Sequence, residues 1–289
     1  MDTNTIGDSE FLVEIETLQP GNLKAAFAVL KEQLTEANID ITPDHIEILQ
    51  MDPTHIVVAH VQLKASNFEK YICKKPIKIG VDIVNLTKVL KGVGAKDILT
   101  FFVEDPSKRA IGNANGEENE TSQLFGIRIE NTEKGQVSTL YIDTLDVNEE
   151  ELVVPNLDYP YYIYMPSSDL QSIVNNQKNV GGEIIQIRYI KDSLYFYTRG
   201  ESGRLETVRS KTAKEDTSIK ITKNIDGNDD IIEIYVKLQK LVEFTKCSSL
   251  SPMATIYLKN DFPLFLEYDV GSLGFIRLGV SPHKKPDNF

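Results

Sequence analysis

The side chains best suited to bind a metal ion or to act as nucleophiles are few in this sequence, and they lie far apart. The four histidines, which have no metal-ligand spacing, are His45, His55, His60 and His283. Neither Cys73 nor Cys247 lies near a histidine in the sequence, so no cysteine–histidine pair is indicated. These residues predict no catalytic residue, no metal site and no cofactor.

The acidic clusters give the same answer. The stretch DGNDD at 226–230 begins like a calcium-binding loop, but Ile231 stands where that loop needs glycine and Lys237 where it needs glutamate. The clusters at 117–120 and 149–151 fall in polar stretches, and we expect them to be solvated. An enzyme built on these carboxylates, such as a metal-dependent hydrolase, is the least favoured alternative because they lack a pocket.

Lysines recur on predicted amphipathic helices, away from the apolar stripe or on its flank. These lysines are Lys24, Lys31, Lys88, Lys91, Lys240 and Lys246. Long, mobile ammonium groups can make many weak contacts with phosphates. They can equally form the solvated face of an ordinary surface helix, and the charge pattern alone favours that interpretation.

The composition limits the class of protein. The chain has 289 residues, which favours two domains. A net charge of −12 argues against a general nucleic-acid-binding protein, because such proteins are normally basic overall. It still allows a basic face on one surface. Two cysteines predict reduced thiols rather than a disulfide framework. The polar, acidic N-terminus predicts no signal peptide, and no apolar run approaches the ~20 residues of a membrane helix.

The apolar pattern repeats itself in the two halves of the chain, which predicts a duplicated α+β fold with antiparallel sheets and short helices on one face. We expect domains at 1–144 and 158–289, joined by a connector at 145–157.

Four helices are predicted. The first has Asn22 as its cap and an apolar stripe from 23 to 34. The second starts near Asp82, the third at 166–168 and the fourth just before Leu238. The predicted strands lie at 10–16, 39–41, 46–51, 56–63, 71–73, 77–81, 98–104, 124–131, 136–143, 161–165, 184–189, 193–198, 204–210, 218–221, 254–258, 263–268 and 275–280. Residues 1–9 are expected to be a leader, 105–123 an exposed loop and 226–230 a turn.

Four segments resemble one known family. They are QMDPTHIVV at 50–58, YICKKPIKIGVDIVNLTKVLK at 71–91, LDVNEEELVVP at 145–155 and PLFLEYDVGSLGFIRLGVSP at 263–282. Together they resemble proliferating cell nuclear antigen (PCNA), the eukaryotic-type DNA sliding clamp family, over roughly residues 10–285. The resemblance implies a homotrimeric ring that encircles double-stranded DNA, acts as a processivity factor for DNA polymerase, and recruits replication and repair proteins. It also implies a clamp loader as a partner, no membrane association and residence in the nucleus, or in a viral replication compartment for a viral protein.

The resemblance further implies where the sites lie. Six lysines match family positions that face DNA: Lys24, Lys31, Lys75, Lys88, Lys91 and Lys246; helical phase adds Lys240. The third helix departs from the family because it presents Ser172, Asn175 and Asn179 where basic residues are usual, so a less positive surface is expected there. Head-to-tail pairing of strand edges implies a subunit interface through Val137, Thr139, Tyr141, Leu205, Thr207 and Arg209.

A partner-binding groove is the other implied site. The matching residues are Met51, His55, Ile56, Val58, Leu152, Val154, Pro263 and Pro282. The resemblance implies that they receive a peptide with a glutamine and paired aromatic residues. The alternative is that the apolar residues among them simply pack in the hydrophobic core. Gly279 replaces a large aromatic residue of relatives, and the connector is about two residues longer, so a wider or reshaped pocket is expected. Lys191 matches a lysine that the family modifies with ubiquitin, and a plain surface lysine is the alternative.

Two other assemblies remain open on the sequence. One is a subunit of a heterotrimeric checkpoint-type clamp, or a clamp-like viral factor that acts as a monomer or dimer. The other is a clamp-like scaffold that binds proteins with weak DNA binding, which the neutral third helix motivates.

Overall fold

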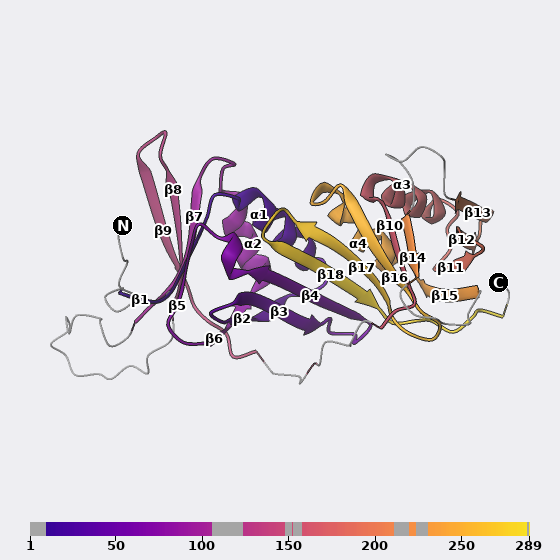
Figure 1. Ribbon diagram of the computed structural model, residues 1–289, viewed down its shortest axis with the longest axis horizontal. Coiled ribbons are helices and arrows are strands. Elements are labelled where there is room, and N and C mark those ends of the chain that lie inside the picture. The colour runs from indigo at the N-terminus through magenta and orange to yellow at the C-terminus, as the bar shows by residue number, and fades with distance from the viewer. Residues whose placement is uncertain are drawn as a thin grey trace. The chain divides into compact units, whose positions relative to one another are not determined.

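The structure is a computed structural model that describes residues 10–105, 124–147, 152, 158–210, 220–223, 231–287 and 289 (Figure 1). The expected leader, nearly all of the expected loop at 105–123 and the DGNDD stretch lie outside these residues. The chain divides into two compact units. The first comprises Met1–Gln50, Val61–Glu151 and Gly271–Gly274, and the second comprises Met51–His60, Leu152–Val270 and Phe275–Phe289. No helix in the described ranges is long and apolar enough to cross a membrane.

A five-stranded antiparallel sheet of the first unit has the order β5-β1-β7-β8-β9. Its strands are β1 (Phe11–Thr17), β5 (Lys70–Cys73), β7 (Ile98–Glu104), β8 (Phe125–Asn131) and β9 (Gln136–Ile142). The inner strands β1 and β7 are largely buried. β9 is an edge strand, and its residues are exposed except Ile142.

Four further strands lie wholly or partly in the first unit, in the order β6-β2-β3-β4. They are β2 (Glu36–Ile41), β3 (His45–Met51), β4 (Val57–Lys64) and β6 (Ile77–Asp82), and the short 3-10 helix η1 (Ala65–Asn67) follows β4. Helix α2 (Ile83–Lys91) packs against β2, β6 and α1 (Pro20–Leu30). The predicted start near Asp82 is confirmed, and Asp82 is the N-cap of α2: its side chain accepts a hydrogen bond of 2.8 Å from the backbone N–H of Asn85.

The predicted start of α1 is wrong. The helix begins at Pro20 with Gln19 as its N-cap, and Asn22 lies inside the first turn. Proline suits the first helical position because its fixed φ matches the helix and its missing N–H would have no partner there. The helix also ends at Leu30, earlier than the apolar stripe suggested, although Leu34 is buried in the turn that follows.

The second unit repeats the design with a four-stranded sheet, β13-β12-β11-β15, and with five strands in the order β14-β10-β16-β17-β18. The first set is β11 (Ile184–Ile190), β12 (Ser193–Gly200), β13 (Gly203–Ser210) and β15 (Ile231–Lys237). The second set is β10 (Tyr161–Pro166), β14 (Lys220–Lys223), β16 (Met253–Leu258), β17 (Leu264–Val270) and β18 (Gly274–Val280). Helix α3 (Ser167–Lys178) packs against α4 (Leu238–Phe244) and against the 3-10 helix η4 (Thr245–Ser249).

Strand β15 was not predicted. Its sequence, IIEIYVK, runs directly into α4 without a glycine, a proline or a capping side chain, so the helix pattern hid the strand before it. The backbone of Lys237 is still extended, and it serves as the N-cap of α4. Each unit thus combines antiparallel strands with two α-helices among its described residues, which confirms the predicted duplicated α+β fold.

Candidate functional site

The lysines predicted to face DNA differ in how they are held in the first unit. Lys24 on α1 is half-buried, and its ammonium group donates a 2.8 Å hydrogen bond to the backbone carbonyl of Val93, just beyond α2. Lys31, in the turn after α1, lies 3.9 Å from Glu32. Lys24 therefore fastens the two helices together as well as adding positive charge beside them.

Three of the lysines predicted to face DNA have exposed side chains in this unit. Lys88 and Lys91 lie in the last turn of α2, and Lys88 donates a 3.0 Å hydrogen bond to the side chain of Asn85. Lys75 lies in the turn between β5 and β6, away from the two helices in sequence. Cations in the last turn of α2 also suit the negative end of the helix dipole.

Helix α3 exposes three neutral side chains at the positions named in the sequence. Ser172, Asn175 and Asn179 are exposed, whereas Leu170, Ile173 and Val174 are buried. Lys178 is also exposed at the end of α3, and the sequence reasoning missed it. Lys246 is exposed in η4.

Lys240 on α4 has a different environment from the exposed lysines. Its ammonium nitrogen lies 3.7 Å from Oδ2 of Asp52 and 3.4 Å from Oε2 of Glu243. Its side chain is only 22% exposed, and the side chain of Asp52 is 3% exposed. Helical phase placed Lys240 with the other lysines, but phase alone does not reveal a carboxylate contributed by residue 52.

Asp52 organises the loop between β3 and β4. Its Oδ1 accepts hydrogen bonds from the backbone N–H groups of Ile56 and Val57, at 2.8 and 2.7 Å. Its Oδ2 accepts a 2.6 Å hydrogen bond from the hydroxyl of Thr54. Burial by itself would raise the pKa of the carboxyl, but these hydrogen bonds and the charge of Lys240 outweigh burial and lower the pKa below its usual value. Asp52 is therefore an ionised group inside the loop at neutral pH.

Most predicted groove residues occur on or beside this loop. Met51, Ile56 and Val58 are half-buried, and His55 is exposed with a left-handed backbone at φ 53°. The backbone N–H of Ser281 donates a 2.9 Å hydrogen bond to the carbonyl of Ile56, which brings exposed Pro282 to the same place. Leu152 and Pro263 are half-buried, and Val154 lies outside the described residues.

The space beside Gly279 on β18 is already filled. A Cβ atom at this position would lie 2.3 Å from Cε1 of Phe265 and 2.7 Å from Cγ1 of Val58. The ring of Phe265, from β17, therefore occupies the room beside Gly279 that a wider pocket would need. A glycine inside a strand often marks such a close approach, and that signal was available in the sequence.

Sequence reasoning also missed Tyr159. Its hydroxyl donates a 2.6 Å hydrogen bond to the carbonyl of Pro263. Its ring makes edge contacts with Phe265 and Tyr257, with centroids 6.0 Å apart in both pairs. Half-buried Val58 packs against the same aromatic cluster. Tyr159 thus holds together Pro263, Phe265 and Val58 around the predicted partner site.

The two predicted interface strands are both edges. β9 ends one sheet and β13 ends another. Val137, Thr139 and Tyr141 on β9 are exposed, whereas Leu205, Thr207 and Arg209 on β13 are half-buried. Thr207 accepts a 3.2 Å hydrogen bond from Gln177, and Arg209 pairs with Asp169, so these side chains contact α3. The exposed apolar residue of β13 is Val208, at 45%, which the sequence reasoning did not name.

Lys191, the predicted modification site, is exposed in the turn between β11 and β12. Both Lys191 and Asp192 have left-handed backbones, with φ of 48° and 62°. Such a two-residue turn fits the twist of a hairpin.

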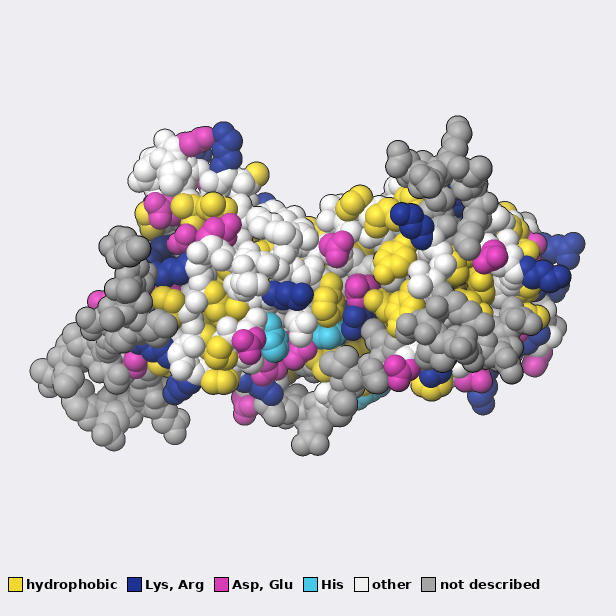
Figure 2. Space-filling view, viewed as in Figure 1, with side chains coloured by type: hydrophobic (Ala, Val, Ile, Leu, Met, Phe, Trp, Pro, Cys, Tyr) yellow, Lys and Arg dark blue, Asp and Glu magenta, His cyan; other side chains and the backbone are white. Residues whose placement is uncertain are grey.

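On the face drawn in Figure 2, basic side chains are interspersed with acidic ones and do not gather into a single patch.

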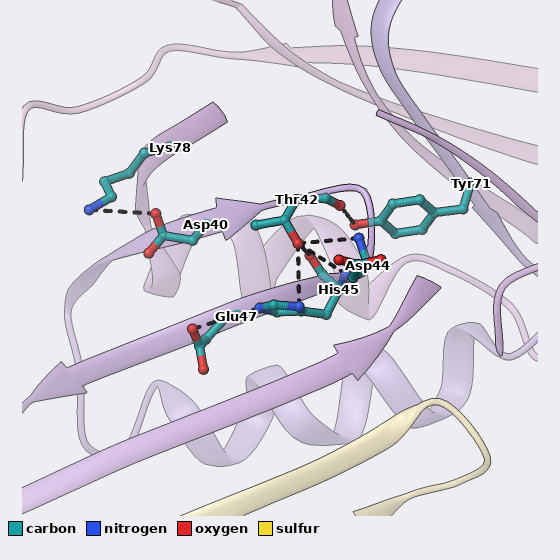
Figure 3. A network of polar contacts seen from close by, with 7 residues as sticks. All are labelled: Asp40, Thr42, Asp44, His45, Glu47, Tyr71 and Lys78. Atoms are coloured by element: carbon teal, nitrogen blue, oxygen red, sulfur yellow. Dashed lines mark hydrogen bonds and ion pairs between the residues drawn. The ribbon is translucent and has the colours of Figure 1, made fainter. Parts of the chain in front are cut away.

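A polar network at the β2–β3 turn has the residue types of a hydrolytic site (Figure 3). Oγ1 of Thr42 lies 3.3 Å from Nδ1 of His45, whose Nε2 lies 3.9 Å from Glu47. However, Oγ1 of Thr42 also accepts from the backbone N–H of His45 and donates to the carbonyl of His45, at 3.1 Å each. Tyr71 donates to the carbonyl of Thr42 at 2.7 Å. The network therefore serves to close the turn.

No cluster of three or more potential metal ligands occurs among the described residues.

Comparison with known proteins identifies the class of this fold. The chain matches the model of the PCNA N-terminal domain over residues 12–149 and that of the PCNA C-terminal domain over residues 153–283. It is also 28% identical over 271 residues to a protein of Dictyostelium discoideum named proliferating cell nuclear antigen, covering 94% of this chain and 99% of the relative. The chain thus contains the two domains of a DNA sliding clamp, the class of protein that acts as a processivity factor in DNA replication. The chain belongs to the PCNA family.

Proposed function

We propose that three copies of this chain form a closed ring around double-stranded DNA. The observation that carries the proposal is that, among the residues the structure describes, β9 and β13 each lie at the edge of a different sheet. An edge exposes a row of backbone N–H and C=O groups and is prone to pair with another chain. Pairing β9 of one copy with β13 of the next is a head-to-tail contact, which closes into a ring when the rotation fits.

Exposed apolar side chains support these two strands as the subunit interface. Val137 is 58% exposed, Tyr141 47% and Val208 45%. Tyr141 is held by a 2.9 Å hydrogen bond to Glu104 and by an edge contact with Phe102. A rigid aromatic residue of this kind is a suitable anchor for a protein interface. The interface in this proposal comprises Val137, Thr139 and Tyr141 of one copy with Leu205, Thr207, Val208 and Arg209 of the next.

DNA contacts in this proposal come from lysines and remain individually weak. The exposed lysines Lys75, Lys88, Lys91 and Lys246 give phosphates an easily exchanged partner, with Lys24 and Lys31 adding to the local charge. Lysine suits sliding because its ammonium group is a mobile point charge, whereas arginine binds phosphate through a fixed fork. Retention on DNA then depends on closure of the ring, and no catalytic residue takes part.

Partner proteins bind at the loop between β3 and β4 in this proposal. His55 and Ile56 on the loop, with Met51, Val58, Leu152, Val154, Pro263 and Pro282, receive a peptide with a glutamine and paired aromatic residues. Apolar surroundings that seat aromatic anchors dominate the energy of such interfaces. DNA polymerase and repair proteins are the partners in this proposal, a clamp loader that uses ATP places the ring on DNA, and the protein works in the nucleus.

Retention on DNA of different topology tests this proposal. The protein is loaded by a eukaryotic clamp loader onto a nicked circular plasmid, washed in high salt, and then followed after the plasmid is cut once. A ring stays on the circle and leaves the linear product through its ends. Equal loss from both forms would contradict encirclement.

A protein-binding scaffold with weak DNA contact is the second candidate. The neutral outer face of α3, with Ser172, Asn175 and Asn179 exposed, favours it. Binding to a primed duplex that weakens steeply with salt would rule this candidate out.

A further inference from the structure

The contact between Asp52 and Lys240 joins two elements with different proposed roles. Asp52 lies in the loop that carries His55 and Ile56, and Lys240 lies on α4, the helix that precedes exposed Lys246. The two charged groups are 3.7 Å apart, and Asp52 is almost fully buried. A charge this buried is expensive unless it is paired and hydrogen-bonded.

Asp52 satisfies the loop from inside. Besides the three hydrogen bonds that its carboxylate accepts, its backbone N–H donates to the carbonyl of Val57 at 2.8 Å, and its carbonyl accepts from the N–H of His55 at 2.9 Å. Every residue from 54 to 57 therefore bonds to Asp52. The carboxylate and the backbone of Asp52 together thus bond to each of these loop residues, including His55 with its left-handed backbone.

Lys240 is the cation that fixes the carboxylate from the other side. It reaches Oδ2, while the two backbone N–H groups bond to Oδ1, so the two oxygens have different partners. Glu243 also approaches Lys240, at 3.4 Å, and keeps its ammonium group between two carboxylates. A lysine held in this way and only 22% exposed is poorly placed to exchange among phosphates.

We propose that Lys240 and Asp52 are a positioning pair for the partner site. Lys240 orients the Asp52 carboxylate, and Asp52 holds the 52–57 loop in the shape that receives a partner peptide. Lys240 would then act on protein binding from a helix whose neighbour, Lys246, acts on DNA. This inference rests on the proposed partner site, and the experiment separates the two.

Hydrogen exchange at single-residue resolution tests the positioning directly, without a partner. Lys240→Met keeps the length of the side chain and removes the charge; Lys246→Met is the matched control, and Lys240→Arg is the conservative variant. We expect Lys240→Met to speed exchange of the Ile56 and Val57 amides about tenfold, a change that corresponds to ~1.4 kcal/mol. Lys240→Arg should restore most of the protection, and Lys246→Met should leave it unchanged. Unchanged exchange in Lys240→Met would overturn the inference.

Binding measurements then connect the loop to function. The probes are a synthetic peptide with a glutamine and two adjacent aromatic residues, and a short DNA duplex. Lys240→Met should weaken peptide binding roughly five- to tenfold, as expected for a partly exposed pair that acts through the loop, and it should leave duplex binding unchanged. Lys246→Met should weaken duplex binding and leave peptide binding unchanged. Loss of duplex binding in Lys240→Met with normal peptide binding would overturn the inference. Failure of the wild-type protein to bind the peptide would contradict the proposed partner site, while the exchange result would still decide whether the pair positions the loop.

Discussion

Gly279 gives the sharpest test of how the partner site is packed. Replacing it with alanine adds one methyl group, whose carbon would lie 2.3 Å from the ring of Phe265 and 2.7 Å from Val58. All three residues are buried or half-buried, so the methyl group cannot turn toward solvent. Overpacking of this kind typically costs about 1–3 kcal/mol. The reduced freedom of the unfolded chain returns about 0.5 kcal/mol, so we expect Gly279→Ala to lower the free energy of unfolding by about 1–2 kcal/mol.

Urea unfolding at pH 7, followed by circular dichroism, measures this change. Gly21→Ala is the matched control, because nothing lies within 4 Å of a methyl group there and the position is helical; it should be neutral or stabilising by up to about 1 kcal/mol. The double variant Phe265→Leu with Gly279→Ala should lose less stability than the two single variants together, because leucine frees the space over residue 279. Equal stability of Gly279→Ala and the wild type would refute the packing of Phe265 over Gly279.

Three further predictions follow from the charged and titratable groups. The double variant Lys88→Ala with Lys91→Ala should bind duplex DNA with a weaker dependence on salt. Fluorescence anisotropy should show the slope of log affinity against log salt concentration reduced by about 0.9 for each lysine that neutralises a phosphate. Lys191→Ala is the control, and an equal slope in the wild type, the double variant and the control would contradict the role of α2. Iodoacetamide at pH 8 should modify half-buried Cys73 slowly and leave Cys247 intact in the folded protein. The reason is that burial raises the pKa of both thiols and that Cys247 is fully buried. Peptide mass spectrometry that finds Cys247 modified as fast as Cys73 would contradict the burial of Cys247. Asp52→Asn should lower stability by about 1–3 kcal/mol at pH 7. Because folding lowers the pKa of Asp52, its contribution to stability is present above the ordinary pKa of a carboxyl group and is lost as pH falls through the lowered one. The difference in free energy of unfolding between Asp52→Asn and the wild type should therefore shrink from pH 7 to acidic pH, as measured by urea unfolding.

Much of the fold could be predicted because its signals are local. The local sequence pattern located β7 and β9 to within a residue, and the start of α2 near Asp82 was also predicted. Errors arose where one local signal masked another. The helix pattern after residue 237 hid β15, and Asn22 suggested a cap although Pro20 already begins α1.

The sites were less predictable because their key contacts join residues that are distant in sequence. Helical phase places Lys240 among the exposed lysines, and only the fold shows that Asp52 lies against it. Similarly, Gly279 in isolation suggests empty space, whereas the neighbouring strand supplies Phe265 to fill it. Predicting such contacts requires knowing which strand lies beside which, and that information is not contained in the pattern of any single segment.

The mass of the protein in solution tests the ring most directly. Light scattering across a dilution series at moderate salt should give a constant mass of three chains of 32.5 kDa, about 98 kDa. Val208→Lys, which places a charge on the β13 edge, should shift the protein toward the monomer, because a charge on an edge strand opposes pairing. A wild-type protein that stays monomeric at micromolar concentration would contradict the pairing of β9 with β13 and, with it, the ring.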